Sequence, residues 1–281
     1  MKPVALGYER PTTIGEASRL LAAEPGAKVI AGGQTLGPML NLRLAQPDLL
    51  VDITRIAELA RVEDDGDAVV LGACVTHAAI EDRRVPDFTN GCLPAVARGI
   101  AYRAVRARGT VGGSLAHADP AADWLSCFAA LGAEVFISGP EGRRRVVIQD
   151  FVRGAMHTDL RAGELVDGVR VPKLSKEART GFYKLCRKTG EFAEAIGMVV
   201  FDSERSHRRF VAGATGGAPI IIDDMGGLFR RGEMADLPKP DAFDVPAAEA
   251  RLKALGLGGD AYELRIHAIA LKRALEKAHA A

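Results

Sequence analysis

The segment spanning residues 108–124 constrains this chain more than any other, because it combines three glycines, two hydroxyl side chains and two carboxylates. Glycine lacks a Cβ and accepts positive φ angles, so Gly112-Gly113 predicts a turn whose backbone N–H groups approach a bound group. Asp119 suits the N-cap of a helix and Pro120 its first turn, which predicts a helix beginning there. The segment therefore indicates a ligand site with donors at the glycines and acceptors at Asp119 and Asp123.

A second glycine pair, Gly32-Gly33, lies between an apolar strand expected at 28–31 and a helix expected at 36–44. A further strand at 49–53 completes a βαβ unit, which places the pair where helix N-termini hold phosphate. Two such turns indicate one long phosphate-bearing ligand. Neither turn has the P-loop pattern or the G-x-G-x-x-G spacing, and each pair taken singly is equally typical of a plain tight turn.

Length and charge bound the class of protein. A chain of 281 residues predicts two or three packed units. The formal net charge of +1 argues against nucleic acid or an anionic membrane as partner. No apolar run is long enough to span a bilayer and the first residues lack a signal-peptide core, so we expect a cytoplasmic protein without a membrane span.

The cysteines predict no metal centre. They are far apart and form no C-x-x-C pair, which favours buried thiols over a zinc or iron–sulfur site. They are Cys74, Cys92, Cys127 and Cys186. The arginines that precede Gly112-Gly113 leave two interpretations open, a positive patch for phosphate or an acidic partner and a solvated face of ion pairs. They are Arg98, Arg103, Arg106 and Arg108.

Periodicity and turn signals predict an α+β fold in three parts. We expect an N-terminal α/β lobe at 1–54, a second α/β lobe at 55–172 and a C-terminal antiparallel sheet with helices at 173–281. Hairpins are expected at 61–72 and 134–148, strands at 165–172, 181–185, 195–201 and 210–214, and closing helices at 247–257 and 264–275. Helices are expected from a Thr13–Glu16 capping box to Leu21, at 75–81 with His77 as a surface or capping residue in the first turn, and at 93–100.

Five segments taken together resemble one family over essentially the full length of the chain. They are Ala31-Gly32-Gly33-Gln34-Thr35-Leu36, Arg43-Leu44-Ala45 with Pro47, Val51-Asp52-Ile53, the segment 108–123, and the later segment 183–192. In this order and separation they resemble the FAD-binding medium subunit of the molybdenum hydroxylases, the carbon monoxide and xanthine dehydrogenase group, whose FAD-binding domain is of the PCMH type.

The resemblance implies an FAD held between the two α/β lobes and covered by the third part. Both glycine loops would bind the diphosphate, Asp123 the ribityl or adenosine hydroxyls, and Lys184 would reach the flavin. The implied FAD contacts are Ala31, Gly32, Gly33, Gln34, Thr35 and Leu36, then Thr110, Val111, Gly112, Gly113, Ser114, His117, Asp119 and Asp123, and around the ring Ile100, Ala101, Leu165, Val166 and Lys184. No catalytic side chain and no metal ligand is expected.

The resemblance also implies a function and partners. Such a subunit passes electrons from the [2Fe-2S] clusters of an iron–sulfur subunit through FAD to an external acceptor, beside a molybdopterin-binding large subunit, in a dimer of heterotrimers. Two alternatives keep the flavin: a self-sufficient flavin oxidase or dehydrogenase of the same fold, and a plain FAD-binding protein. A third, a serine hydrolase, arises because 112–116 nearly matches a nucleophile elbow.

The chain departs from the family pattern at several positions. The segment 101–107 stands where the family commonly has Gly-Asp followed by Gln-Val-Arg-Asn, which concerns the edge of the flavin. Thr35 replaces a serine and keeps its hydroxyl. Phe182 and Phe192 replace tyrosines, so an aromatic cover over the ring would lack its phenol.

Overall fold

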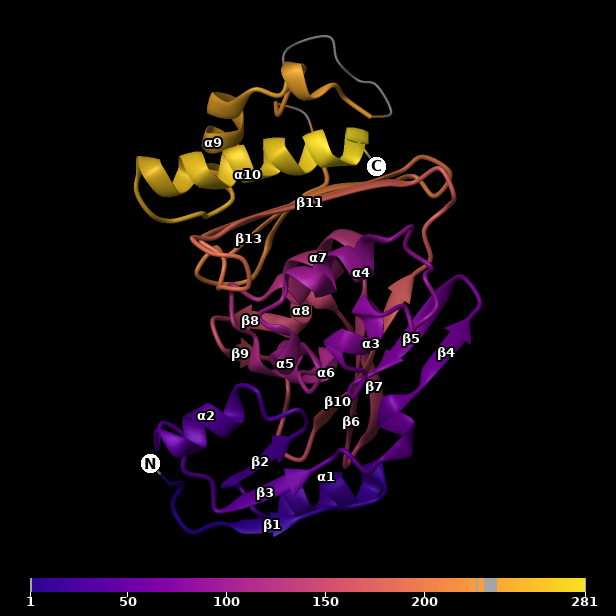
Figure 1. Ribbon diagram of the computed structural model, residues 1–281, viewed down its shortest axis with the longest axis vertical. Coiled ribbons are helices and arrows are strands. Elements are labelled where there is room, and N and C mark those ends of the chain that lie inside the picture. The colour runs from indigo at the N-terminus through magenta and orange to yellow at the C-terminus, as the bar shows by residue number, and fades with distance from the viewer. Residues whose placement is uncertain (1, 226, 230–236, 281) are drawn as a thin grey trace.

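The computed structural model describes residues 2–225, 227–229 and 237–280 and contains three main β-sheets arranged along its long axis (Figure 1). The N-terminal sheet lies at one end, the second sheet with most of the short helices in the middle, and the C-terminal sheet with two long helices at the other end. Among the described residues, no helix has both the length and the apolar character needed to cross a bilayer. The α+β fold expected from the sequence is confirmed.

The N-terminal sheet is parallel and contains the predicted βαβ unit. Its strand order is β1-β3-β2, and the central strand β3 pairs in parallel with both β1 and β2. The first helix begins after Thr13, whose hydroxyl accepts the Glu16 N–H at 3.2 Å, as the predicted cap requires. The short edge strand β1 was not expected. The elements are β1 (Gly7–Glu9), α1 (Ile14–Ala23), β2 (Ala27–Ile30), α2 (Leu36–Asn41) and β3 (Leu49–Asp52).

The middle sheet is antiparallel, with strand order β4-β5-β10-β6-β7. Both predicted hairpins are present, as β4–β5 and β6–β7. The strands are β4 (Val62–Asp65), β5 (Ala68–Gly72), β6 (Glu134–Gly139), β7 (Gly142–Val147) and β10 (Leu165–Pro172), with a small separate hairpin β8 (Val152–Gly154) and β9 (His157–Thr158). The helices are η1 (Ala57–Ala60), α3 (His77–Glu81), α4 (Cys92–Gly99), α5 (Arg103–Arg106), α6 (Val111–His117), α7 (Asp123–Leu131) and α8 (Ile148–Phe151).

Helix α7 is the central helix of the core, and its start differs from the sequence prediction. All nine residues of α7 are buried, and Trp124 stacks on Phe128 at a centroid distance of 5.1 Å. The helix begins at Asp123 and not at Pro120. The Asp119 carboxylate instead accepts the Ala121 N–H at 2.9 Å, which closes a local turn before the helix. Asp119 therefore makes the side-chain-to-backbone bond typical of an N-cap, but it makes this bond about one turn before α7 begins at Asp123.

The C-terminal sheet lies between α7 and the long helix α10. Every residue of its strand β12 is buried, because Met198 and Val200 face the core shared with α7, whereas Val199 and Phe201 face α10. The strand order is β11-β12-β13-β14. The elements are β11 (Arg179–Leu185), β12 (Ala195–Asp202), β13 (His207–Gly213), β14 (Ile220–Ile222), η2 (Pro240–Ala242), α9 (Val245–Ala254) and α10 (Ala261–Ala280).

Candidate functional site

The two glycine-bearing segments, 76 residues apart, lie in direct contact. A Cβ on Gly32 would overlap the carbonyl oxygen of Arg108 and lie 3.0 Å from the Cα of Gly109. The Arg108 Nε donates to the Gly32 carbonyl at 3.4 Å. Only glycine permits this approach of two backbones. The segments therefore form one surface, which we call the glycine cradle and define as residues 31–36 and 109–114.

The first half of the cradle is the turn that the sequence predicts. Gly33 has a φ angle of 68°, and the Gln34 side-chain amide donates to the Gly32 carbonyl at 3.1 Å. Thr35 is exposed at the N-cap of α2, and its hydroxyl makes no capping bond. Ala31 and Leu36 are half-buried on either side of the turn. The turn thus ends at the start of a helix, where backbone N–H groups lack intrahelical partners.

The second half of the cradle is a helix start and not the glycine turn that the sequence indicated. Helix α6 begins after Thr110, whose hydroxyl accepts the Gly113 N–H at 3.1 Å. Gly112 and Gly113 lie in its first turn, and neither has a positive φ angle. The requirement for glycine at 112 comes from packing, because a Cβ there would overlap Ala73. Val111 is buried, Gly113 is exposed and Ser114 is half-buried.

A buried histidine supports the second half of the cradle. The His77 backbone N–H donates to the Gly109 carbonyl at 3.0 Å, and Trp124 Nε1 donates to His77 Nδ1 at 3.0 Å. A Cβ on Gly109 would lie only 2.8 Å from His77 Nε2. Burial, and secondarily the charge of Arg106, lowers the pKa of His77 to about 4, so the ring is neutral. The sequence indicated only a surface or capping histidine here.

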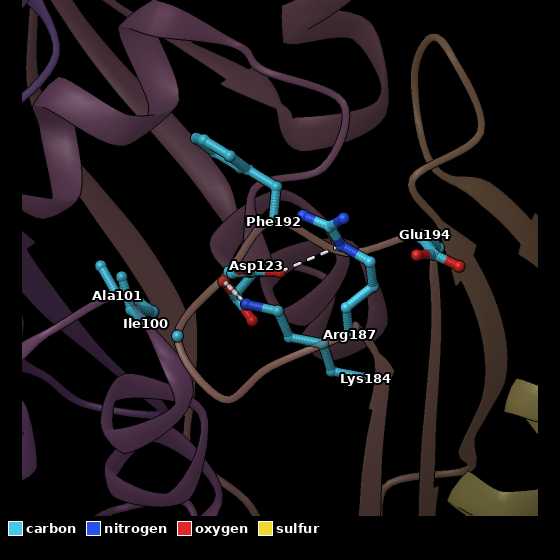
Figure 2. Close-up of a pocket in the computed structure, with 9 residues that line it drawn as sticks. Ile100, Ala101, Asp123, Lys184, Arg187, Phe192 and Glu194 are labelled. Atoms are coloured by element: carbon cyan, nitrogen blue, oxygen red, sulfur yellow. Dashed lines mark hydrogen bonds and ion pairs between the residues drawn. The ribbon is translucent and has the colours of Figure 1, made fainter.

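A pocket of about 370 Å³ lies next to the N-terminus of α7 (Figure 2). It unites four of the expected FAD contacts, Ile100, Ala101, Asp123 and Lys184. They come from the turn after α4, the first residue of α7 and strand β11. The rest of the lining comes from the loop between β11 and β12, namely Arg187, Gly190, Glu191, Phe192 and Glu194. The pocket is thus built from two sheet layers.

Asp123 and Lys184 form an almost fully buried ion pair in this pocket. Lys184 Nζ lies 3.1 Å from Asp123 Oδ2, and the side chains are 9% and 6% exposed for lysine and aspartate (Figure 2). Burial raises the pKa of the Asp123 carboxyl, and the charge of Lys184 only partly opposes this. The second oxygen, Asp123 Oδ1, is buried and accepts no hydrogen bond.

An unpartnered carboxylate oxygen in a pocket suits a ligand with a hydroxyl donor. Leaving such an oxygen buried without a partner costs about 1–3 kcal/mol, which a bound hydroxyl would recover. FAD carries a hydroxyl-bearing ribityl chain, an anionic diphosphate and a flat ring. The orphaned Asp123 Oδ1, the cradle with half-buried Gly32 and Gly33 and exposed Gly113, and the pocket match these three parts. The residues present therefore fit the cofactor expected from the sequence.

The remaining expected contacts lie outside the pocket. Leu165 and Val166, at the start of β10, are only 2% and 4% exposed and belong to the core of the middle sheet. His117 ends α6, and the left-handed Ala118, with a φ angle of 50°, separates it from Asp119. Asp119 already accepts the Ala121 N–H. Whether these four residues contact FAD stays a prediction.

The arginines that precede the cradle support the ion-pair interpretation at two of four positions. Arg103 Nη1 lies 2.8 Å from Glu81 Oε2 and 2.7 Å from Asp82 Oδ1, and Arg106 Nε lies 2.8 Å from Glu81 Oε2.

The four cysteines are free thiols. Within the described part of the chain, no group of three or more histidine, cysteine or acidic side chains could hold a metal ion.

Sequence reasoning missed most of the loop that closes the pocket. The segment 183–192 was singled out by resemblance, and of its residues Lys184 was expected at the flavin and Phe192 as an aromatic cover. The Arg187–Glu191 pair, whose arginine side chain is 82% exposed, and the 72% exposed Phe192 follow no periodic pattern. The usable signal was Gly190, whose φ angle of 90° and position against the Ala101 carbonyl mark a close approach.

Comparisons with known proteins agree on one family. The family model described as the FAD binding domain in molybdopterin dehydrogenase matches residues 4–174. The chain is 36% identical to the nicotine 6-hydroxylase medium subunit of Paenarthrobacter nicotinovorans, over 78% of this chain and 76% of that protein. It is 32% identical to the carbon monoxide dehydrogenase medium chain of Afipia carboxidovorans, over 100% and 99%.

Solved structures give the same result for the fold. The structure of a Cu,Mo-CO dehydrogenase in its cyanide-inactivated form matches with a TM-score of 0.87 and 30% identity, over 100% of this chain and 99% of that one. A chain of the quinoline 2-oxidoreductase from Pseudomonas putida 86 matches with a TM-score of 0.82 and 29% identity, over 100% and 99%.

Proposed function

The chain belongs to the family of FAD-binding domains of molybdopterin dehydrogenases, and from this premise we propose that it passes electrons from the [2Fe-2S] clusters of a partner subunit through FAD to an external acceptor. It is the FAD-binding medium subunit of an oxidoreductase. When bound, FAD supplies the redox chemistry, and the protein supplies binding, orientation and a controlled environment.

One observation carries the assignment of the site. The glycine cradle and the pocket are joined by the residues 101–110, and the pocket presents the unpartnered Asp123 Oδ1. In the proposal, backbone N–H groups of the cradle's first half bind the diphosphate, and the glycines of its second half let the phosphate lie close to the backbone. The N–H groups of Gly112 and Gly113 themselves donate to the Ala73 carbonyl and the Thr110 hydroxyl. Asp123 accepts a hydroxyl of the cofactor and Lys184 holds the carboxylate in place. Ile100 and Ala101 form the wall beside the ring.

The proposed partners are an iron–sulfur subunit and a molybdopterin-binding large subunit, in a dimer of heterotrimers. The support is that the relatives are named as medium chains or subunits of larger enzymes, such as caffeine dehydrogenase subunit beta of a Pseudomonas strain. Their names refer to nicotine, caffeine and carbon monoxide, although their FAD-binding chains are alike. We therefore place substrate selection in another subunit. We also place the complex in the cytoplasm, as expected from the sequence.

The division into lobes at 1–54, 55–172 and 173–281 belongs to the same proposal. Its support is that each range contains one of the main sheets, the parallel sheet first, the antiparallel middle sheet second and the sheet with α9 and α10 third. Under this division the cradle takes one half from each of the first two lobes. The pocket takes Lys184 from the third.

The proposal is tested by purifying the complex through a tag on this chain, as the wild type and as two variants of helix α7. Asp123→Asn removes the charge of the carboxylate whose Oδ1 atom has no hydrogen-bond partner. Ser126→Ala is the matched control, because Ser126 Oγ is also buried without a hydrogen bond but lies against Gly213 and not in the pocket. FAD, iron and molybdenum are measured for each complex, together with the rate of reduction of an artificial acceptor.

We expect the wild type and Ser126→Ala to contain all three components. Asp123→Asn should keep iron and molybdenum but lose FAD affinity about tenfold or more, with a parallel loss of acceptor reduction, because a hydrogen bond to a charged group is removed. Wild-type chain that purifies without metal-containing partners and oxidises a substrate alone would support the self-sufficient oxidase instead. Equal FAD retention in both variants would refute the site.

A further inference from the structure

Three consecutive carbonyls, starting with that of the last residue of helix α4, each accept a hydrogen bond from a side-chain cation. Lys184 Nζ donates to the Gly99 carbonyl at 3.4 Å, and Arg106 Nη1 donates to the carbonyls of Ile100 and Ala101 at 2.9 and 2.8 Å. The last carbonyls of a helix lack intrahelical partners, so cations are well placed there. Because Ile100 and Ala101 also line the pocket, these cations fix its wall.

The wall needs this support because its backbone is bent unfavourably. Ala101 has a φ angle of 41°, in the left-handed region that residues with a Cβ avoid. The loop after β11 packs on the same bend, since a Cβ on Gly190 would lie 2.8 Å from the Ala101 carbonyl oxygen. A change in the bend would therefore move both sides of the pocket.

Glu81 holds the arginine that holds the bend. Its carboxylate accepts from Arg106 Nε at 2.8 Å and from Nη2 at 3.0 Å, a bidentate pair in which the side chains are 13% and 11% exposed for glutamate and arginine. The hydrogen bond from Arg106 lowers the pKa of Glu81, so the pair stays charged. This fixes the plane of the guanidinium and directs Nη1 at the two carbonyls.

We propose that Glu81 and Arg106 are positioning residues that hold the Ile100–Ala101 bend in the shape the flavin ring requires, without touching FAD themselves. The inference rests on the proposed function, because it takes the pocket to be the place of the ring. Arg106 lies at the end of the short helix α5, within the segment 101–107 that departs from the family pattern.

Arg103 offers a matched control on the same helix. It also pairs with Glu81, and it donates to both oxygens of Asp82 at 2.7 Å, but it is 54% exposed and reaches neither carbonyl of the bend. Arg103→Gln and Arg106→Gln therefore remove the same charge from the same helix. Only the second removes the support of Ile100 and Ala101.

The test is a titration of the full chain with FAD, followed by flavin fluorescence, with the flavin absorption spectrum and a thermal melt for each variant. Arg106→Gln should raise the Kd for FAD about tenfold or more and change the fine structure of the flavin absorption band. Arg103→Gln should change the Kd by less than about twofold, because exposed ion pairs contribute little. Adding Ala101→Gly to Arg106→Gln should recover about threefold in affinity, because glycine adopts the left-handed bend without strain.

Each outcome decides the matter. Folded Arg106→Gln with unchanged Kd and spectrum, equal effects of the two arginine variants, or no recovery by Ala101→Gly would overturn the inference. If Arg106→Gln does not fold, Arg106→Lys takes its place, because it keeps the charge and loses the fork; unchanged affinity in that variant also overturns it. A wild-type chain that binds no FAD at all would instead refute the proposed function.

Discussion

At the scale of single residues, the proposed site depends on two buried polar residues, Asp123 and His77. Asp123 keeps one oxygen on Lys184 and leaves the other without a partner, and burial raises its pKa. His77 is the second buried polar group, bonded to Trp124 and packed against Gly109 of the cradle. Both residues have a pKa shifted by burial, which is common among residues at functional sites.

His77 gives a pH dependence with a definite sign. Its folded pKa of about 4 lies below the usual histidine value of 6.5, so between these two pH values the unfolded chain binds a proton that the folded chain does not bind. The free energy of unfolding should therefore fall as the pH drops through this window, by about 2 kcal/mol between pH 7 and pH 5 from this residue. Denaturant titrations at both pH values would measure it.

The matched variant for this prediction is His77→Gln, which cannot take up the proton. It should be less stable than the wild type at pH 7, because it loses the acceptor for Trp124 Nε1, and its stability should depend less on pH by the same amount. Wild type and variant with the same loss of stability between pH 7 and pH 5 would contradict the assignment.

At the scale of elements, the close packing of helix α10 on the C-terminal sheet holds strand β11, and with it Lys184, in place. Gly181 and Gly197 face α10, and a Cβ on either would overlap a helix carbonyl, that of Ala274 or Ala270. Small residues on both surfaces let the helix lie close to the strands. This close packing fixes the position of strand β11, which carries Lys184, against α10.

Gly197→Ala tests this packing. The new methyl group would meet the backbone of α10, which cannot move aside as a side chain could, so the free energy of unfolding should fall by about 1–3 kcal/mol. Gly15→Ala in α1 is the control, because a Cβ there meets nothing within 4 Å and alanine favours a helix. Chemical denaturation should show the first variant destabilised and the second unchanged or slightly more stable. Equal stability of both variants would contradict the close contact.

The elements also show how far sequence reasoning reaches. Hairpins and the βαβ unit follow from alternation and turn residues, so β2, β3 and the β6–β7 pair could be expected. The start of α7 could not, because Asp119-Pro120 has the local chemistry of a cap while tertiary packing decides that the helix begins at Asp123. Helix α5 was missed because four residues carry no period.

The same limit applies to the candidate site. The resemblance selected Ile100, Ala101, Asp123 and Lys184, which come from distant parts of the sequence and line one pocket in the structure. The neutral His77 and the support of the wall by Arg106 depend on contacts across elements, which no local pattern records. Glycines were found correctly but explained partly wrongly, because Gly112 is required by packing on Ala73 and not by its φ angle.

At the scale of the whole molecule, the proposed site draws on all three sheet layers, which follow one another along the long axis (Figure 1). The first layer supplies Gly32 and its turn, the middle layer supplies the second half of the cradle and Asp123, and the third supplies Lys184. A cofactor long enough to contact all three would link layers that otherwise meet through separate contacts. A ligand that binds only the folded state stabilises it, so bound FAD should raise the free energy of unfolding of the whole molecule.

The most direct measurement of the central claim, that the two distant glycine segments bind one FAD together, is amide hydrogen exchange of the full chain with and without FAD. The account predicts that exchange slows in both segments, 31–36 and 109–114, at the same FAD concentration, while the exposed edge strand β4 changes little. Slower exchange in only one segment, or in neither, at FAD concentrations that saturate the flavin signal would contradict the claim.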